Sequence, residues 1–213
     1  MNIEQKVLQP GDQRYTIAFP TGYSENTPVP LILALHFAGH GTPFYGRMIL
    51  EELVKPALGD LGGLIVAPDC TSDSWSNPQS EADVLTLLDY VSSNYAVDPE
   101  RVVVTGYSMG GNGTWYLAAR NPALFSAAVV LSGWPPEEVG LVDWQVPSYV
   151  IHSRQDELMP LEPTQFAVTS LAEKGAEIEL MILDDITHFE TFRFIEPLRS
   201  VFPWIEQVWQ AQG

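Results

Sequence analysis

The chain has 213 residues, a length that favours one α/β domain over two very small ones. Its formal net charge of -17 comes from 27 acidic and 10 basic residues. Such a surface repels phosphate backbones and anionic lipid, so we expect neither a nucleic acid nor a membrane as a partner. Apolar residues make up 46% of the sequence and charged residues 17%, which excludes an intrinsically disordered chain and predicts one folded domain over residues 1–213.

The N-terminal residues contain no basic segment followed by an apolar stretch, so we expect no signal peptide. No apolar run approaches the ~20 residues that a membrane-spanning helix needs. Cys70 is the one cysteine, which excludes a disulfide within the chain, and we expect it to be a buried structural thiol. Together these features predict a cytoplasmic protein, either a monomer or a homodimer.

Short apolar runs follow one another along the chain. The first, at residues 14–19 (RYTIAF), alternates between polar and apolar side chains and indicates an antiparallel or edge strand. The apolar residues of the later runs are continuous rather than alternating, as in strands buried on both faces of a parallel sheet. They lie at residues 31–37 (LILALHF), 64–67 (LIVA), 101–105 (RVVVT), 127–131 (AAVVL), 149–152 (YVIH) and 178–183 (IELMIL).

Helical patterns fill the intervals between these runs. Ser80 and Asp83 resemble a capping box, and apolar side chains follow at the spacing of one helix face. Gly175 predicts the end of a later helix. The predicted helices cover a segment from residue 80, residues 109–120, residues 162–174 and residues 192–210, the last interrupted by two prolines. Strands that alternate with helices predict a doubly wound α/β fold, with a mostly parallel sheet and helices on both faces.

Residues 106–110 (GYSMG) fit the pattern G-x-S-x-G at the junction of a predicted strand and a predicted helix. A nucleophile elbow has this context, because its sharp turn projects a serine hydroxyl above the edge of the sheet. The same letters also occur in ordinary glycine-rich turns, so the pattern alone is weak and its position favours the catalytic interpretation. The N–H groups at the start of the helix would also favour negative charge that develops near Ser108.

A serine hydroxyl needs a base to take its proton, and His188 lies after the last predicted strand, where a base would be placed. His152 ends an earlier strand and is expected to be a core histidine. The base needs a carboxylate that holds its tautomer, and Asp156, close after the strand at 149–152, is the first candidate. The alternatives are Glu157, Asp184 and Asp185. Ser108, Asp156 and His188 follow the chain order of the triad in α/β-hydrolases.

An oxyanion that forms next to the serine needs two hydrogen-bond donors. The N–H of Met109, directly after the serine, is one candidate. The second is expected from the loop at residues 33–41 (LALHFAGHG), where the N–H of Ala38 is the first choice and that of Phe37 the second. An ordinary glycine loop is the alternative interpretation of this segment.

The chain resembles the small, lidless serine esterases of the α/β-hydrolase superfamily, which include carboxylesterase/phospholipase, dienelactone-hydrolase-like and feruloyl-esterase-like proteins. The resemblance covers LILALHFAGHG, DPERVVVTGYSMGGNGTWYLAARNPALFSAAVVLSG, HSRQDELMP and THF. It implies that Ser108 is the nucleophile, Asp156 the acid and His188 the base, with Ala38 and Met109 as oxyanion donors and with no cofactor and no metal. The chain departs from these esterases at residues 37 and 153, where they usually have glycine and this sequence has Phe and Ser.

The interval between the predicted strands at 127–131 and 149–152 is too short for a cap domain, so the predicted site is open. Tyr107 and Phe189 flank triad residues and, with Phe37, are the candidates for an apolar substrate pocket. Such a pocket favours small or aromatic esters over long lipids. Anionic acyl groups are less favoured because no basic clamp is evident, although Arg47 or Arg154 could supply one.

We therefore predict a carboxylic ester hydrolase that acts on a small-molecule ester through an acyl-enzyme. The alternatives are a thioesterase, lysophospholipase or peptidase with the same triad, and a non-catalytic binding protein with the same fold. A lyase or a dehalogenase is disfavoured, because those relatives generally have Asp rather than Ser at the elbow.

Overall fold

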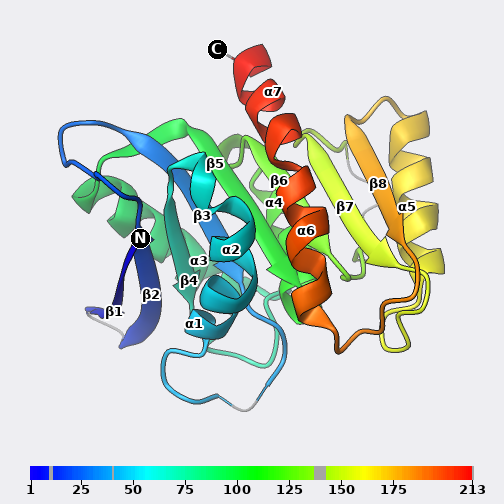
Figure 1. Cartoon of the computed structure of the whole chain (residues 1–213), viewed down its shortest axis with the longest axis horizontal. Coiled ribbons are helices and arrows are strands. Elements are labelled where there is room, and N and C mark those ends of the chain that lie inside the picture. Colours follow the sequence, from blue (N-terminus) through cyan, green and yellow to red (C-terminus); the bar gives the residue numbers. More distant parts are fainter. Residues whose placement is uncertain (10–11, 40, 137–142, 213) are drawn as a thin grey trace.

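A computed structural model of the chain describes residues 1–9, 12–39, 41–136 and 143–212, which are built around one eight-stranded sheet (Figure 1). The strand order is β1-β2-β4-β3-β5-β6-β7-β8. Strands β3 to β8 are parallel to one another, whereas β1 and β2 are antiparallel to their neighbours. The bounds are β1 (Asn2–Leu8), β2 (Gln13–Phe19), β3 (Val29–Leu35), β4 (Leu64–Pro68), β5 (Val97–Tyr107), β6 (Ala127–Leu131), β7 (Ser148–Ser153) and β8 (Ile178–Leu183).

Helices cover both faces of this sheet, and in Figure 1 α1, α2, α6 and α7 lie in front of it whereas α3 and α4 lie behind. The helices are α1 (Gly46–Ile49), α2 (Lys55–Leu58), α3 (Pro78–Asn94), α4 (Met109–Arg120), α5 (Leu161–Glu173), α6 (Ile195–Ser200) and α7 (Phe202–Gln212). A π-helical turn (Leu50–Val54) joins α1 to α2, and short 3-10 turns lie at Gly59–Leu61, Pro122–Leu124 and Thr191–Phe194.

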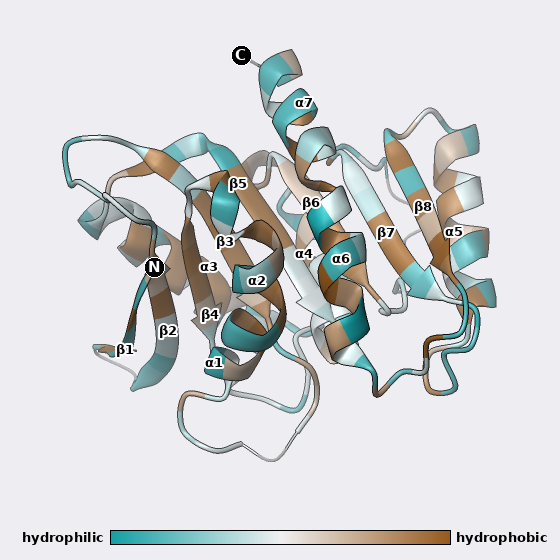
Figure 2. Ribbon diagram, viewed as in Figure 1, coloured by the Kyte–Doolittle hydropathy of each residue, from teal (hydrophilic) through white to brown (hydrophobic). Residues whose placement is uncertain are grey.

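Each face of the sheet has its own apolar core, and the central strands contribute to both. Leu31, Leu33 and Leu35 of β3 belong to the core that also contains residues of α3, α4 and α5. Ile32 and Ala34 belong to the core on the other face, with residues of the segment from α1 to α2 and of α6 and α7. This double burial explains why the central strands are apolar throughout. Figure 2 shows the same pattern, with hydrophobic strands inside and hydrophilic residues on the outer surfaces of the helices.

The predicted doubly wound fold is confirmed, with corrections at its first edge. The strand at residues 14–19 is antiparallel as expected, but it lies inside the sheet because β1 forms the edge. Strand β1 was not predicted from the sequence, because most of its side chains are exposed or half-buried and form no apolar face. The run predicted at 31–37 ends as a strand at Leu35, so His36 and Phe37 belong to the loop that follows.

The helices predicted at residues 109–120 and 162–174 are confirmed as α4 and α5, the latter shifted by one residue. The capping box predicted at Ser80 and Asp83 is wrong, because α3 begins earlier. The N-cap of α3 is Asn77, whose side chain accepts a hydrogen bond from the backbone N–H of Ser80 at 3.0 Å. Ser80 therefore lies inside the first turn. The helical segment from α1 to α2 was not predicted from the sequence. Gly175 follows α5 with a φ of 92°, the left-handed conformation of a helix stop.

A buried carboxylate joins α3 to α4. Glu81 accepts hydrogen bonds from Arg120 Nε at 2.7 Å, from Asn121 Nδ2 at 2.8 Å and from the Tyr116 hydroxyl at 3.2 Å. Burial opposes ionisation of Glu81, but the hydrogen bonds from Asn121 and Arg120 outweigh it and hold the pKa of the carboxyl below its ordinary value. This network anchors the C-terminal end of the helix that begins at the elbow.

The described part of the connection between β6 and β7 contains no helix or strand, and no cap domain is evident over the sheet. Residues 137–142 of this connection lie outside the described residues. Within the described ranges, no helix has the length and apolarity needed to cross a membrane.

Candidate active site

The strand, turn and helix expected around Ser108 are all present. Ser108 lies between the end of β5 and the first residue of α4, with φ 57° and ψ -117°. A non-glycine residue with such a backbone is strained by about 1–3 kcal/mol and must be held by its surroundings. Here the Ser108 N–H donates to the carbonyl of Leu131 at 3.0 Å, and the Ser108 carbonyl accepts from the N–H of Asn112 at 2.9 Å. The turn therefore has the conformation of a nucleophile elbow.

Two glycines let the elbow lie close to the neighbouring strand. A Cβ atom on Gly106 would collide with the carbonyl oxygen of Gly110, and one on Gly110 would collide with the carbonyl oxygen of Leu35. Only glycine avoids these contacts. The first turn of α4 consequently lies against the end of β3, where the predicted oxyanion loop begins.

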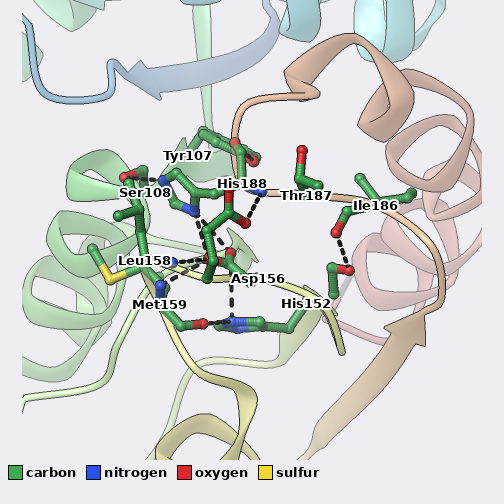
Figure 3. A network of polar contacts seen from close by, with 12 residues as sticks. Tyr107, Ser108, His152, Asp156, Leu158, Met159, Ile186, Thr187 and His188 are labelled. Atoms are coloured by element: carbon green, nitrogen blue, oxygen red, sulfur yellow. Dashed lines mark hydrogen bonds and ion pairs between the residues drawn. The ribbon is translucent and has the colours of Figure 1, made fainter.

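The structure brings Ser108, Asp156 and His188 together from three separate loops (Figure 3). His188 Nε2 lies 2.8 Å from Ser108 Oγ, and His188 Nδ1 lies 2.8 Å from both carboxylate oxygens of Asp156. All three side chains are buried. Because a carboxylate can only accept, Nδ1 carries the proton, and Nε2 is left to accept the hydroxyl proton of Ser108. This is the hydrogen-bond order in which an imidazole activates a serine.

Asp156 is held by its own loop as well as by the imidazole. Its Oδ1 accepts backbone N–H bonds from Leu158 at 3.1 Å and from Met159 at 2.7 Å. Burial opposes the charge, but the hydrogen bonds from His188 and Met159 outweigh it and hold the pKa of Asp156 below its ordinary value. The carboxylate is therefore ionised at neutral pH and can stabilise a positively charged imidazole.

The other three acidic candidates have different partners. Glu157 accepts the backbone N–H of His188 at 2.9 Å, so it contacts the histidine but not its ring. Asp184 pairs with Arg154 at 2.9 Å on the surface. The backbone N–H of Asp185 donates to Gln155. Of the four carboxylates considered from the sequence, Asp156 is the one that lies at the imidazole.

Further bonds hold the backbone of the His188 loop, and these were not predicted. The Tyr107 hydroxyl donates to the carbonyl of His188 at 2.7 Å, and the Ser153 hydroxyl donates to the carbonyl of Ile186 at 2.5 Å. With Glu157, they fix the peptide groups on both sides of the imidazole. No sequence motif predicts these hydrogen bonds, because each one joins residues that follow different strands.

His152, expected as a core histidine, is fully buried beside the triad. Its Nε2–H donates to the carbonyl of Met159 at 2.6 Å, and Nε2 lies 3.8 Å from Asp156 Oδ2. Burial, the largest effect, lowers the pKa of His152, so its ring is neutral at neutral pH. The ring supports the loop that carries Asp156.

An apolar cavity of about 370 Å³ opens beside Ser108 and His188. The three predicted pocket residues all line it, together with three that were not predicted as pocket walls: Phe37, Tyr107, Phe189, Ala38, Leu158 and Thr191. Phe189 is 72% exposed and Leu158 is 50% exposed, so the rim is open to solvent. The backbone of Phe37 lies outside the left-handed region, so the absence of glycine at this position causes no strain.

The chain matches the model of the dienelactone hydrolase family over residues 70–197, which is more than half of its length and includes Ser108, Asp156 and His188. The chain belongs to the dienelactone hydrolase family. It is 30% identical over 134 residues to a probable feruloyl esterase C of Aspergillus niger, covering 60% of this chain and 48% of that protein. It is 28% identical over 163 residues to feruloyl esterase C of Emericella nidulans, covering 73% of this chain and 59% of the relative.

This member of the dienelactone hydrolase family spans about half the length of the curated relatives it matches. Among solved structures, a thermostable esterase is similar with a TM-score of 0.72 at 23% identity, over 96% of this chain and 59% of that one. At this identity the likeness shows the fold alone, and it agrees with the mostly parallel sheet described above.

This family member also has a polar cavity of about 400 Å³ beside the loop after β3, which the sequence did not predict. Ala38 lines both cavities, and Met109 lines the polar one. Arg14 of β2, the loop after β3 and residues 69–73 after β4 meet there. Cys70 is half-buried in this wall rather than buried, and its thiol donates to the carbonyl of Ser72 at 3.3 Å.

Neither arginine considered from the sequence lines either cavity. Arg47 pairs with Glu51 and Arg154 pairs with Asp184, both at exposed positions. Among the residues that the structure describes, no cluster of three or more His, Cys, Asp or Glu side chains could hold a metal ion.

Proposed function

We propose that this chain is a carboxylic ester hydrolase that works through an acyl-enzyme on Ser108. The observation that carries the proposal is the continuous chain of hydrogen bonds from Asp156 through His188 to the Ser108 hydroxyl, next to an apolar cavity. A serine on a strained elbow with a histidine at 2.8 Å fits nucleophilic catalysis and has no evident structural purpose. Membership of the family and the esterase names of the relatives support the same class of reaction.

In the first step, Ser108 Oγ attacks the carbonyl carbon of the ester while His188 Nε2 takes the hydroxyl proton. Asp156 stabilises the imidazolium that forms. The tetrahedral intermediate collapses, and His188 gives its proton to the alkoxide, which leaves as the alcohol. Water then attacks the acyl-enzyme with His188 as the base again, which releases the acid and restores the Ser108 hydroxyl.

The backbone N–H groups of Met109 and Ala38 are the proposed oxyanion donors. Met109 is the first residue of α4, and the N–H groups of a first turn have no acceptor within the helix. Ala38 lines the cavity that also contains Ser108 and His188. Two such donors stabilise charge that develops on the ester oxygen, each contributing about 10²–10³ in kcat in comparable sites.

Small or aromatic esters are the proposed substrates. The cavity is apolar and is lined by three aromatic side chains. No cap that could enclose a long chain is evident among the residues that the structure describes. The relatives are named feruloyl esterases, so we include esters of aromatic acids among the proposed substrates. The same triad supports hydrolysis of thioesters, lysophospholipids or small peptides, and a non-catalytic binding protein is the remaining alternative.

The test is a substrate panel with the wild-type chain and Ser108→Ala. We expect hydrolysis of p-nitrophenyl acetate and butyrate, a fall in kcat/KM with longer acyl chains, and no turnover by the variant. A higher kcat/KM on an acyl-CoA or on a lysophospholipid would move the assignment to that class. Equal rates from the wild type and Ser108→Ala would contradict the enzyme proposal.

A further inference from the structure

His36 is a buried histidine outside the proposed triad, in the loop that follows β3. Its Nδ1 lies 2.7 Å from the carbonyl oxygen of Phe37, and its Nε2 accepts the backbone N–H of Cys70 at 3.0 Å. A carbonyl can only accept and an N–H can only donate, so these two partners allow one neutral tautomer, with the proton on Nδ1. The structure thus fixes which ring nitrogen of His36 is the donor.

The Phe37 carbonyl that His36 holds belongs to the same peptide group as the N–H of Ala38. A trans peptide group is planar, so its C=O and N–H point in opposite directions. When Nδ1–H of His36 holds the carbonyl oxygen on one side, the N–H of Ala38 is directed to the other side. Ala38 lines both the polar cavity, which His36 also lines, and the cavity of Ser108, which His36 does not line.

We propose that His36 is a positioning residue that orients the Ala38 N–H as an oxyanion donor, an inference that rests on the proposed esterase function. It contacts no reacting atom and acts through one peptide group. Its contribution belongs to the transition state, because only there does the ester oxygen carry the charge that this N–H stabilises.

The surroundings of His36 keep its ring in this orientation. Trp75 Nε1–H donates to the carbonyl of His36 at 2.9 Å, which fixes the preceding peptide group as well. The rings of Trp75 and Tyr45 pack edge-on against the imidazole, with centroids at 5.0 Å and 4.9 Å. Burial, the largest effect, lowers the pKa of His36, in keeping with the neutral ring that the two hydrogen bonds require.

Two variants separate the two hydrogen bonds of this ring. His36→Asn places an amide NH₂ where Nδ1 lies, so it keeps a donor to Phe37 and loses the acceptor for Cys70. His36→Gln places an amide oxygen where Nε2 lies, so it keeps the acceptor and loses the donor. Both remove the packing of the ring, which makes each the control for the other.

We measure kcat and KM on p-nitrophenyl acetate and the inhibition constant of a trifluoromethyl ketone, which forms an oxyanion when Ser108 adds to it. Loss of a whole oxyanion donor costs about 10²–10³ in kcat, so a misdirected donor should cost about 10–100-fold. We expect this loss in kcat and in affinity for the ketone for His36→Gln, with KM within about 3-fold. His36→Asn should stay within about 5-fold of the wild type. Equal losses in both variants, or a larger loss in His36→Asn, would mean that His36 only supports the packing of the loop.

A measurement on the wild type keeps the inference testable if a variant does not fold. The ¹⁵N chemical shifts of labelled histidines report the tautomer, and we expect His36 to carry its proton on Nδ1 at neutral pH. A proton on Nε2 would overturn the inference. If the wild type hydrolyses no ester at all, the proposed function fails instead, and the two failures are thereby distinguished.

Discussion

Replacement of Asp156 by Asn tests the assignment of the acid. In Asp156→Asn, an amide oxygen at the position of Oδ1 would keep the backbone bonds from Leu158 and Met159. The amide NH₂ group would then lie where Oδ2 now accepts from His188 Nδ1 at 2.8 Å. Oδ1 also lies 2.8 Å from Nδ1, but it already accepts the two backbone N–H bonds, and a proton on Nδ1 would face the new NH₂ group. We therefore expect the imidazole to change to the tautomer with its proton on Nε2, in which Nδ1 accepts from the amide. In that tautomer it cannot accept the proton of Ser108.

We expect Asp156→Asn to lower kcat by about 10⁴-fold, the loss found when the acid of other triads is changed to an amide. At 1.36 kcal/mol for each factor of ten, this corresponds to about 5.4 kcal/mol of transition-state stabilisation. The thermal midpoint should change little, because the number of hydrogen bonds is conserved. The assay is the initial rate on p-nitrophenyl acetate, with Ser108→Ala as the background.

Asp184→Asn is the matched control, because it makes the same chemical change in an exposed carboxylate near the histidine loop. We expect it to retain the wild-type rate, since its ion pair with Arg154 contributes about 0–1 kcal/mol to stability. A rate above one tenth of the wild type for Asp156→Asn would refute the reasoning. So would a large loss in Asp184→Asn, which would transfer the role of acid to that residue.

Three further changes test other parts of the structure. Gly110→Ala adds a Cβ atom that collides with the carbonyl oxygen of Leu35. The free energy of unfolding, measured in urea, should fall by about 1–3 kcal/mol, and kcat should fall because the start of α4 moves. An unchanged urea midpoint would mean that the elbow is not tightly packed. Glu81→Gln should destabilise the fold by roughly 1 kcal/mol at neutral pH. The folded-state pKa of Glu81 is lowered, so its stabilisation is present above its ordinary value of 4.5 and is lost as the pH falls through the folded value; a difference from the wild type that persists at low pH would contradict this sign. Phe37→Ala removes one wall of the apolar cavity, so kcat/KM should rise for longer acyl chains relative to acetate, whereas an unchanged chain-length profile would place the acyl group elsewhere.

The central part of the fold could be predicted because its strands are buried on both faces. The continuous apolar run at residues 127–131 coincides with β6, which is buried along its whole length. The run at residues 178–183 coincides with β8, but β8 forms the other edge of the sheet and is half-buried or exposed, so the expectation that both of its faces are buried is wrong. The edge strand β1 could not be found this way, since all of its residues except Leu8 are exposed or half-buried and they form no hydrophobic face. The segment from α1 to α2 includes a π-helical turn, which breaks the regular helical spacing on which such predictions depend.

The residues of the site could be predicted to the extent that each follows a strand. Ser108, Asp156 and His188 come after strand ends, and parallel strands bring those ends to one edge of the sheet. The orienting bonds of Glu157 and His36 could not be predicted, because they depend on where loop peptide groups point. Glu157 is an example. Its position after the strand made it a candidate for the acid, but its side chain accepts the backbone N–H of His188 instead.

The proposal that Ser108 is an activated nucleophile is tested most directly by reaction of the folded chain with a fluorophosphonate, followed by mass measurement of the intact protein and of its peptides. The wild type should gain one adduct, located on Ser108, and Ser108→Ala should gain none under the same conditions. His188 at 2.8 Å from the hydroxyl is the physical reason for that reactivity. Folded wild-type protein that gains no adduct, or that carries it on another residue, would contradict the account.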